Sequence, residues 1–277
     1  MQMPELPEVE TVKRTLEKKI KGLTITDVEI DMPKIIRDTT PEDFKKAVTG
    51  IKILRLARRG KYLLIYLSGE NVLVIHLRMT GRLVYTEASE PVPRHTHLIF
   101  HLSDGYQLRF NDVRQFGRVI LATNKTLSHI KGFKDLGPEP LEKDFTRDFL
   151  RRELKRKRTR IKPLLLDQTF IAGLGNIYVD ETLHRARIHP ERLACNLSPR
   201  EIANLYHSIC EVLREGIDNR GTSMRDYVDG DGRTGNFQEF LRVYNREGEK
   251  CPRCGATIDR IKVGGRSSYY CPVCQKE

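Results

Sequence analysis

Four cysteines near the C-terminus constrain the fold of this chain more than any other feature. They form two C-x2-C pairs, Cys251 with Cys254 and Cys271 with Cys274, and sixteen residues separate the pairs. This spacing is typical of a zinc ribbon, in which four thiolates surround one ion as a tetrahedron. The residues between the pairs predict two short strands joined by a Gly-Gly turn at 264–265. The sequence therefore predicts one structural Zn2+ on a C-terminal β-hairpin.

Two disulfides are the alternative arrangement of these four cysteines. The N-terminal sequence MQMPELPEVE has neither the basic start nor the apolar stretch of a secretory signal, so we expect an intracellular protein. Disulfides are rare inside cells, and zinc is therefore favoured. Cys195 and Cys210 fall in a region with helical patterning, where we expect ordinary core or surface thiols.

The composition limits the size and the partners of the protein. The 277 residues correspond to about two domains, and the 39% of hydrophobic residues suffice for a core. No uncharged apolar stretch approaches the ~18 residues that span a bilayer. The 49 Lys and Arg residues against 37 Asp and Glu give a net charge of +12, which favours a polyanionic partner. Charge alone does not distinguish nucleic acid from a membrane surface or a ribosome.

The first half of the chain predicts a helix followed by a β-sandwich. Helical spacing of apolar residues begins near Pro7, and Gly22 provides a helix stop. From about residue 25 to residue 123, β-branched and aromatic residues predict strands. The strand segments that we expect are Lys52–Leu67, Asn71–Leu77, Thr96–Leu102 and Tyr106–Asn111, with a hairpin turn at 103–105. Several antiparallel strands of this size favour a two-layer sandwich.

The second half predicts a helical domain that carries the zinc hairpin. A connector with glycine and proline leads into helical patterning from about Arg147 to Asn219. The clearest helix is Ser198–Asp218, which has serine as its N-cap, proline at its first position and one apolar face. The chain shows no internal repeat and no low-complexity segment.

The N-terminal block PELPE, residues 4–8, has two interpretations. In the first it is an ordinary helix start, with proline in the first turn and acids near the positive end of the helix dipole. In the second, Pro4 is N-terminal: its secondary amine attacks a sugar C1′ to form a Schiff base, and Glu5 protonates a leaving oxygen. Because an internal proline nitrogen is an amide, the second interpretation requires translation from Met3 and removal of Met3. Residues 1–2 are then a misassigned start or an addition to the natural chain.

A glycine-rich turn and two basic stretches favour a nucleic acid partner. The turn precedes Asn176, which we expect to cap a helix over Ile177–Ala186, and its backbone N–H groups suit a phosphate. The alternative is a helix–turn–helix corner that binds nothing. The stretches 151–162 and 52–61 hold eight and five Lys or Arg residues. A charge run alone is usually a solvated surface, but together these features favour a groove that binds a nucleic acid backbone.

Four further residues are candidates for contact with bases or phosphates. Arg266 sits on the predicted ribbon turn, where an arginine could reach a phosphate or a base edge. The alternative is ordinary surface charge. Met79, Arg114 and Phe116 lie at or near strand ends. Methionine and phenylalanine at such positions are usually core residues, but an exposed group of this kind suits insertion into a base stack.

Four blocks of sequence, together with the cysteines, resemble the bacterial formamidopyrimidine-DNA glycosylase family. They are MPELPEVET at 3–11, RGKYL at 59–63, HLRMTG at 76–81 and GNIYVDE at 175–181. The blocks occur in the family's order over nearly the whole chain. The N-terminal block resembles this branch more than the related endonuclease VIII branch.

The resemblance implies an α+β fold with an N-terminal helix plus antiparallel β-sandwich, a helical helix–two-turn–helix domain and a C-terminal β-hairpin zinc finger. The implied boundaries are 1–134 for the catalytic β-sandwich domain, 135–143 for a linker, 144–225 for the DNA-binding helical domain, and 226–277 for a lesion loop and the zinc finger. We expect a monomer that binds no membrane and acts in the bacterial cytoplasm at the nucleoid.

The resemblance also implies a bifunctional base-excision-repair enzyme. Its partner is double-stranded DNA containing oxidised purines, namely 8-oxoguanine opposite C and formamidopyrimidines, and it flips the damaged base out of the duplex. An N-terminal proline Schiff base then leads to β- and δ-eliminations that nick the strand.

Individual roles follow from the matched motifs. Pro4 is the implied nucleophile, Glu5 the acid/base and Glu8 a structural carboxylate beside them. Lys61 contacts phosphate and assists catalysis. His76 and Lys162 bind the DNA backbone, while Asn176 and Arg266 hold the phosphates that flank the lesion. Met79, Arg114 and Phe116 fill the gap left by the flipped base, with Arg114 facing the orphaned cytosine.

One departure and two alternatives accompany this interpretation. Thr80 stands where some relatives carry Glu, so lesion contacts are not transferable at that position. The Gly- and Asp-rich loop 222–236 is expected to cover the flipped base. The alternatives are the endonuclease VIII-like branch, which prefers oxidised pyrimidines, and a non-catalytic zinc-ribbon DNA-binding protein in which Pro4 only starts a helix.

Overall fold

The computed structural model describes residues 3–276, so the predicted misassigned start at Met1 and Gln2 lies outside the described residues. The chain divides into two compact units. Of the described residues, the first unit contains those up to Lys134 together with Asn219–Gln238, and the second contains Asp135–Asp218 together with those from Glu239 onward. The segment 219–238 therefore packs with the N-terminal part of the chain, although it lies far from that part in sequence. The domain boundaries expected from the sequence stay a prediction.

The first unit begins with helix α1 (Leu6–Ile20), whose N-cap is Glu5. A capping box closes this end, because the Glu5 backbone N–H donates to Glu8 Oε2 over 2.8 Å and the Glu5 side chain accepts from the Glu8 backbone. The apolar stripe of α1 is fully buried and consists of Val9, Val12, Leu16 and Ile20. The helix predicted near Pro7 is confirmed.

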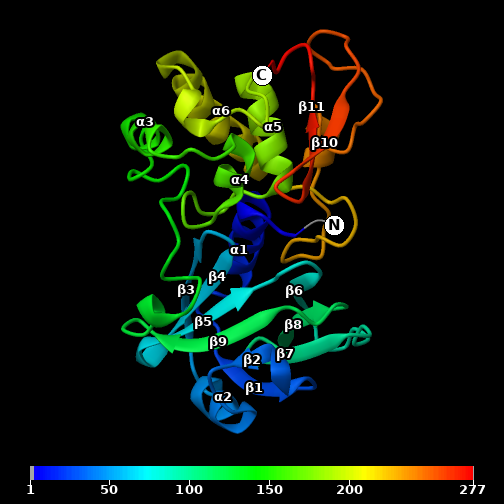
Figure 1. Ribbon diagram of the computed structural model, residues 1–277. Coiled ribbons are helices and arrows are strands. Elements are labelled where there is room, and N and C mark those ends of the chain that lie inside the picture. The colour runs from blue at the N-terminus through cyan, green and yellow to red at the C-terminus, as the bar shows by residue number, and fades with distance from the viewer. Residues whose placement is uncertain (1–2, 277) are drawn as a thin grey trace. The chain divides into compact units, whose positions relative to one another are not determined.

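The strands of the first unit form two sheets (Figure 1). The four-stranded sheet contains β1 (Ile25–Ile30), β6 (Gly81–Glu87), β7 (Thr96–Leu102) and β8 (Tyr106–Asp112), in the order β1-β7-β8-β6. The five-stranded sheet contains β2 (Ile36–Arg37), β3 (Ile53–Arg59), β4 (Tyr62–Leu67), β5 (Asn71–His76) and β9 (Arg118–Thr123), in the order β2-β9-β5-β4-β3. Neighbouring strands are antiparallel except for β2 and β9.

One hydrophobic core joins both sheets to α1, which packs against β3, β4 and β6. Leu16 of α1, Ile65 of β4 and Phe110 of β8 are members of this core and are at most 1% exposed. The predicted two-layer arrangement is confirmed.

Two details of the first unit differ from the sequence-based expectation. Helix α2 (Pro41–Val48) interrupts the region where only strands were expected. Thr40 is the N-cap of this helix, and its side chain accepts the Asp43 N–H over 3.1 Å. Phe44 of the helix is buried in the core. The expected strand segment 52–67 is a hairpin of β3 and β4 with a two-residue turn.

The described residues of the second unit form four α-helices. They are α3 (Arg147–Lys155), α4 (Ile161–Leu166), α5 (Asn176–Ala186) and α6 (Pro199–Asp218), and α5 packs against α4 and α6. Ser198 precedes α6, and its hydroxyl accepts the Glu201 N–H as an N-cap should. The expectation that Asn176 caps α5 is wrong, because Gly175 is the N-cap and Asn176 is the first helical residue.

The C-terminal hairpin of the second unit pairs β10 (Asp259–Val263) with β11 (Arg266–Tyr270) through the predicted Gly-Gly turn. Short 3-10 helices complete the described chain at Pro33–Ile35, Ser68–Glu70, Leu127–His129, Ala194–Asn196 and Phe237–Phe240. Among residues 3–276, the helices lack the combination of length and apolar character that crossing a membrane requires.

Candidate active site and zinc centre

The buried Glu8 carboxylate organises the N-terminus of α1. It accepts the Glu5 N–H over 2.8 Å and the Thr222 N–H over 2.7 Å, while the Tyr227 hydroxyl donates to the Glu8 carbonyl over 3.2 Å. Gly221 has φ +79°, and a Cβ there would lie 2.9 Å from Glu8 Oε1, so this approach requires glycine. Glu8 thus ties the residues that follow Pro4 to the segment 219–238 of the same unit.

Lys61 lies in the tight turn between β3 and β4 and is 5% exposed. The residue after it, Tyr62, pairs with His76 on β5, and their rings meet edge-on with centroids 4.7 Å apart. Burial, followed by the charges of Arg78 and Lys61, lowers the pKa of His76 to about 3. The His76 ring is therefore neutral. Its Nδ1 accepts the Arg78 N–H over 3.0 Å, which places the proton on Nε2, where it can be donated to an anionic oxygen.

A cavity of about 250 Å³ lies beside Pro4 within the first unit. Its lining residues are Pro4, Met79, Thr80, Val113, Arg114, Arg225, Asp226 and Tyr227. The structure therefore brings the predicted nucleophile, two members of the predicted base-stack wedge and part of the loop expected over 222–236 to one cavity. Arg225, Asp226 and Tyr227 belong to that loop, and no sequence pattern marked them individually.

The three predicted wedge residues lie together. Arg114 Nη1 donates to the Met79 sulfur over 3.3 Å, and the Arg114 guanidinium lies 5.0 Å from the centroid of the Phe116 ring. The Phe116 side chain is 51% exposed. An exposed aromatic ring beside an arginine is well suited to entering a base stack.

Asp112 supports this wedge and was missed by the sequence analysis. Its fully buried carboxylate accepts the Gly117 N–H over 2.7 Å and the Arg114 N–H over 3.2 Å, and the Thr80 hydroxyl donates to it. The loops that carry Met79 and Arg114 are therefore joined through one buried side chain. The available signal was an aspartate at a strand end just before a turn, where its carboxylate accepts nearby backbone N–H groups.

In the second unit, Asn176 and Lys162 converge on Ser267, close to the turn of the C-terminal hairpin. Asn176 Nδ2 donates to the Ser267 carbonyl over 3.0 Å, and Lys162 Nζ donates to the same oxygen over 2.7 Å. Arg266 is the preceding residue and is exposed. Asn176 and Lys162 therefore hold the carbonyl of the residue that directly follows Arg266.

Lys162 itself is fully buried in an ion pair. Its ammonium lies 2.6 Å from Asp180 Oδ1, and Asp180 Oδ2 accepts the Tyr269 N–H over 3.1 Å. This pair fastens β11 to helices α4 and α5. A direct DNA contact by Lys162 stays a prediction, and its buried contacts give it an internal structural role.

The four predicted zinc ligands also meet in the second unit. The sulfur atoms of Cys251, Cys254, Cys271 and Cys274 all lie within 4.8 Å of one another. Zn–S bonds of about 2.3 Å place the corners of a ZnS4 tetrahedron about 3.8 Å apart, and Cys254 and Cys271 Sγ are separated by 3.5 Å. The cysteines fit one structural Zn2+, and His184 Nε2 lies 3.4 Å from Cys251 Sγ, as a neighbouring hydrogen-bond partner of a zinc thiolate does.

Three family models match consecutive parts of the chain. A formamidopyrimidine-DNA glycosylase N-terminal domain matches residues 3–119, and a formamidopyrimidine-DNA glycosylase H2TH domain matches residues 136–228. The zinc finger found in FPG and IleRS matches residues 248–276.

The chain belongs to the formamidopyrimidine-DNA glycosylase family.

Curated relatives cover the whole length of the chain. The formamidopyrimidine-DNA glycosylase of Pelotomaculum thermopropionicum is 64% identical over 274 residues, which are 99% of each chain. The formamidopyrimidine-DNA glycosylase of Desulforamulus reducens is 57% identical over 275 residues, again 99% of each chain. The family resemblance stated from the sequence motifs is confirmed.

Solved structures of formamidopyrimidine-DNA glycosylases share the fold. A Lactococcus lactis Fpg mutant in complex with DNA containing Fapy-dG superimposes with a TM-score of 0.93 at 43% identity, covering 99% of this chain and 100% of that one. L. lactis Fpg with DNA containing an abasic site gives the same values. MutM in complex with DNA containing carbocyclic 8-oxo-G gives a TM-score of 0.92 at 43% identity, with the same coverage.

Proposed function

We propose that this chain is a bifunctional base-excision-repair DNA glycosylase and AP lyase that removes oxidised purines. The full-length similarity to formamidopyrimidine-DNA glycosylases, including chains solved with Fapy-dG and 8-oxo-G DNA, is the observation that carries the proposal. The cavity beside Pro4 supports it, because Met79 and Arg114 of the predicted wedge share that cavity. Double-stranded DNA that contains a damaged purine is the partner.

In the proposed reaction Pro4 is the nucleophile and requires a free secondary amine. We therefore propose that the active chain begins at Pro4, after translation from Met3 and removal of Met3. The amine then lies just before the positive end of the α1 dipole, which disfavours the ammonium form and favours the nucleophilic form. The amine attacks the sugar C1′ and loses its proton, while the C1′–N bond to the base breaks and the base leaves with a proton. Glu5 then protonates the sugar ring oxygen as the ring opens to the iminium. The resulting iminium acidifies the adjacent sugar protons, and β- and δ-elimination follow.

The remaining predicted residues hold the substrate in the proposal. Lys61 and neutral His76 bind backbone phosphate beside the reacting sugar, as the pairing of Tyr62, the residue after Lys61, with His76 allows. Arg114 faces the orphaned cytosine, while Met79 and Phe116 fill the gap. In the second unit, Asn176 and Arg266 hold the phosphates next to the lesion, and the zinc finger supports Arg266.

A panel of lesion duplexes tests the proposal. We expect strand nicking at 8-oxoguanine and formamidopyrimidine opposite C, and much slower nicking at an oxidised pyrimidine. A reversed preference would place the activity with the endonuclease VIII-like branch. Binding without any nicking would support the non-catalytic zinc-ribbon alternative. Asp27→Asn, which removes only an exposed ion pair with Lys45 on the first unit, is the matched control and should behave as the wild type.

The cellular location and the oligomeric state are also part of the proposal. The curated relatives are bacterial, and DNA in bacteria lies in the cytoplasm. We therefore place the activity in the cytoplasm, at nucleoid DNA, with a single chain acting on each lesion.

A further inference from the structure

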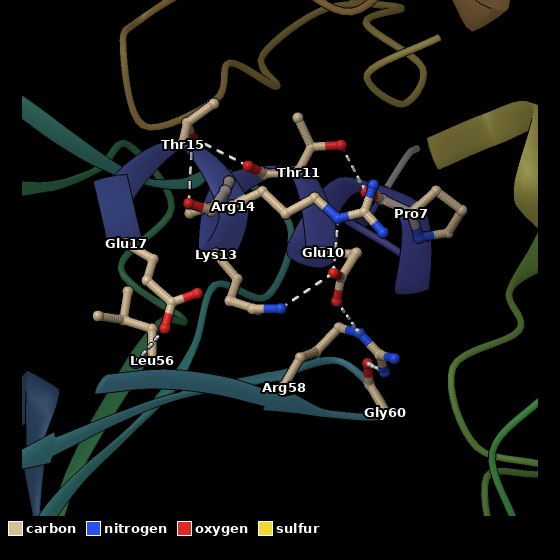
Figure 2. Close-up of polar contacts among 11 residues, drawn as sticks. Pro7, Glu10, Thr11, Lys13, Arg14, Thr15, Glu17, Leu56, Arg58 and Gly60 are labelled. Atoms are coloured by element: carbon tan, nitrogen blue, oxygen red, sulfur yellow. Dashed lines mark hydrogen bonds and ion pairs between the residues drawn. The ribbon is translucent and has the colours of Figure 1, made fainter. Parts of the chain in front are cut away.

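The turn that carries Lys61 is tied to helix α1 by two buried side chains (Figure 2). Arg58 Nε donates to Glu10 Oε2 over 3.1 Å, and Arg58 Nη1 donates to the Gly60 carbonyl over 3.1 Å. The side chains of Arg58 and Glu10 are only 7% and 11% exposed. A guanidinium is planar and rigid, so two bonds from different nitrogens fix both its place and its orientation.

Glu10 is held as a carboxylate by three cations. Besides Arg58, its other oxygen accepts from Lys13 Nζ over 3.1 Å and from Arg14 Nε over 2.8 Å. Burial by itself raises the pKa of Glu10, but the hydrogen bond from Arg14 and the charges of Arg58 and Lys13 outweigh it and lower the pKa below its ordinary value. The anchor for Arg58 is therefore charged throughout the neutral range.

The Gly60 carbonyl connects the ion pair of Arg58 and Glu10 to Lys61. That carbonyl belongs to the peptide group whose nitrogen is Lys61, so holding it fixes the plane from which the Lys61 side chain departs. Of the two turn residues only Gly60 has positive φ, +55°, as in a type II′ hairpin turn that needs glycine first. Such a two-residue turn leaves Lys61 little freedom once its peptide plane is held.

Helix α1 connects the two parts of the proposed active site, which are the N-terminal residues before the helix and the turn that carries Lys61. The Leu56 N–H donates to Glu17 Oε1 over 3.2 Å, so strand β3 is attached to α1 at a second point (Figure 2). The same helix begins directly after Pro4 and Glu5. The contacts of Glu10 and Arg58 thus run from the helix that follows the nucleophile to the turn that carries the lysine.

We propose that Glu10 and Arg58 are positioning residues for Lys61 in base excision. The proposal rests on the proposed function and adds two residues to its machinery. Neither residue is among the implied catalytic or DNA-binding positions. Their action is to hold the Gly60–Lys61 peptide so that the Lys61 ammonium meets the substrate in one geometry.

The test is a double-mutant cycle read by the single-turnover excision rate at saturating enzyme. Arg58→Gln removes the ion pair, and we expect the rate to fall about 10- to 100-fold, since a displacement of about 1 Å costs up to that much. Combined with Lys61→Ala, the same substitution should change the rate less than about twofold, because the group it positions is gone. Arg14→Gln is the matched control: it removes another partner of Glu10 without touching Gly60, and its rate should equal that of the wild type.

Arg58→Lys keeps the result interpretable where Arg58→Gln folds poorly. A lysine reaches Glu10 or Gly60 but does not make both bonds, so thermal stability should stay close to that of the wild type while the rate still falls. If Arg58→Gln lowers the excision rate by the same factor in the wild type and in the Lys61→Ala variant, the positioning proposal is overturned. A rate unchanged in both Arg58 variants would also overturn it. Failure of the wild type to excise any oxidised purine would instead overturn the proposed function, so the two failures are distinguishable.

Discussion

The ion pair between Lys162 and Asp180 is closed off from solvent, with 0% and 1% of the two side chains exposed. Lys162→Met preserves much of the side-chain volume but leaves the Asp180 carboxylate buried without its cation. Removing one partner of a buried pair costs about 3–5 kcal/mol. We therefore expect Lys162→Met to lower the free energy of unfolding of the second unit by about that amount at pH 8.

The loss should depend on pH in a defined direction. Burial raises the pKa of Asp180, and in the variant the opposing charge of Lys162 is absent. The folded carboxyl then keeps a proton that the unfolded chain releases, so the stability of the variant falls as pH rises. The loss should be smaller at pH 6 than at pH 8. Adding Asp180→Asn removes the buried charge and keeps an oxygen for the Tyr269 N–H, and should restore at least half of the loss.

Urea denaturation at both pH values measures these differences. A loss below about 1 kcal/mol at pH 8, or no recovery in the double variant, would refute the reasoning that the pair is a buried structural bond. If Lys162 acted mainly as a DNA contact, Lys162→Met would leave the free energy of unfolding unchanged and would reduce the salt slope of DNA binding by about 0.9.

Two further predictions concern the zinc centre and a buried histidine. Cys254→Ala should lose Zn2+, release β10 and β11 together with Arg266, and abolish tight binding of DNA containing an abasic-site analogue in an anisotropy titration; retained affinity would argue against this role of the finger. His76 has a pKa lowered to about 3, against an ordinary 6.5, so in acid the unfolded chain takes up a proton that the folded ring does not. Through this group the wild type should lose about 1.4 kcal/mol of stability per pH unit between pH 6 and pH 4. In urea titrations, His76→Asn should lose less stability between pH 6 and pH 4 than the wild type. The same loss in both proteins would contradict a lowered pKa of His76.

Local patterns predicted much of the fold. The apolar spacing after Pro7, the Ser198 cap and the cysteine spacing each specify an element through neighbours close in sequence, and the structure contains all three. Helix α2 was missed although Thr40, Pro41 and two acids give a regular helix start, because β-branched residues on both sides dominated the pattern. The misplaced cap at Asn176 is an error of one residue, within the precision with which sequence defines a helix end.

Long-range contacts set the limit of sequence reasoning at the site. Motifs indicated which residues matter, but the approach of Glu8 to Thr222 joins positions more than two hundred residues apart in the chain. The role of Asp112 in joining two loops, and the burial of Lys162, depend equally on tertiary packing. The Arg58 contact with Gly60 is local, yet its meaning appears only once Glu10 of α1 is seen beside it.

The central claim is that Pro4 forms a Schiff base with the damaged nucleotide. The most direct measurement is borohydride trapping with a duplex that carries 8-oxoguanine opposite C, using protein that begins at Met3, followed by peptide mass mapping. We predict one covalent adduct, located on the nitrogen of an N-terminal Pro4. A folded, zinc-loaded protein that binds this duplex and gives no adduct, or an adduct on a different residue, would contradict the claim.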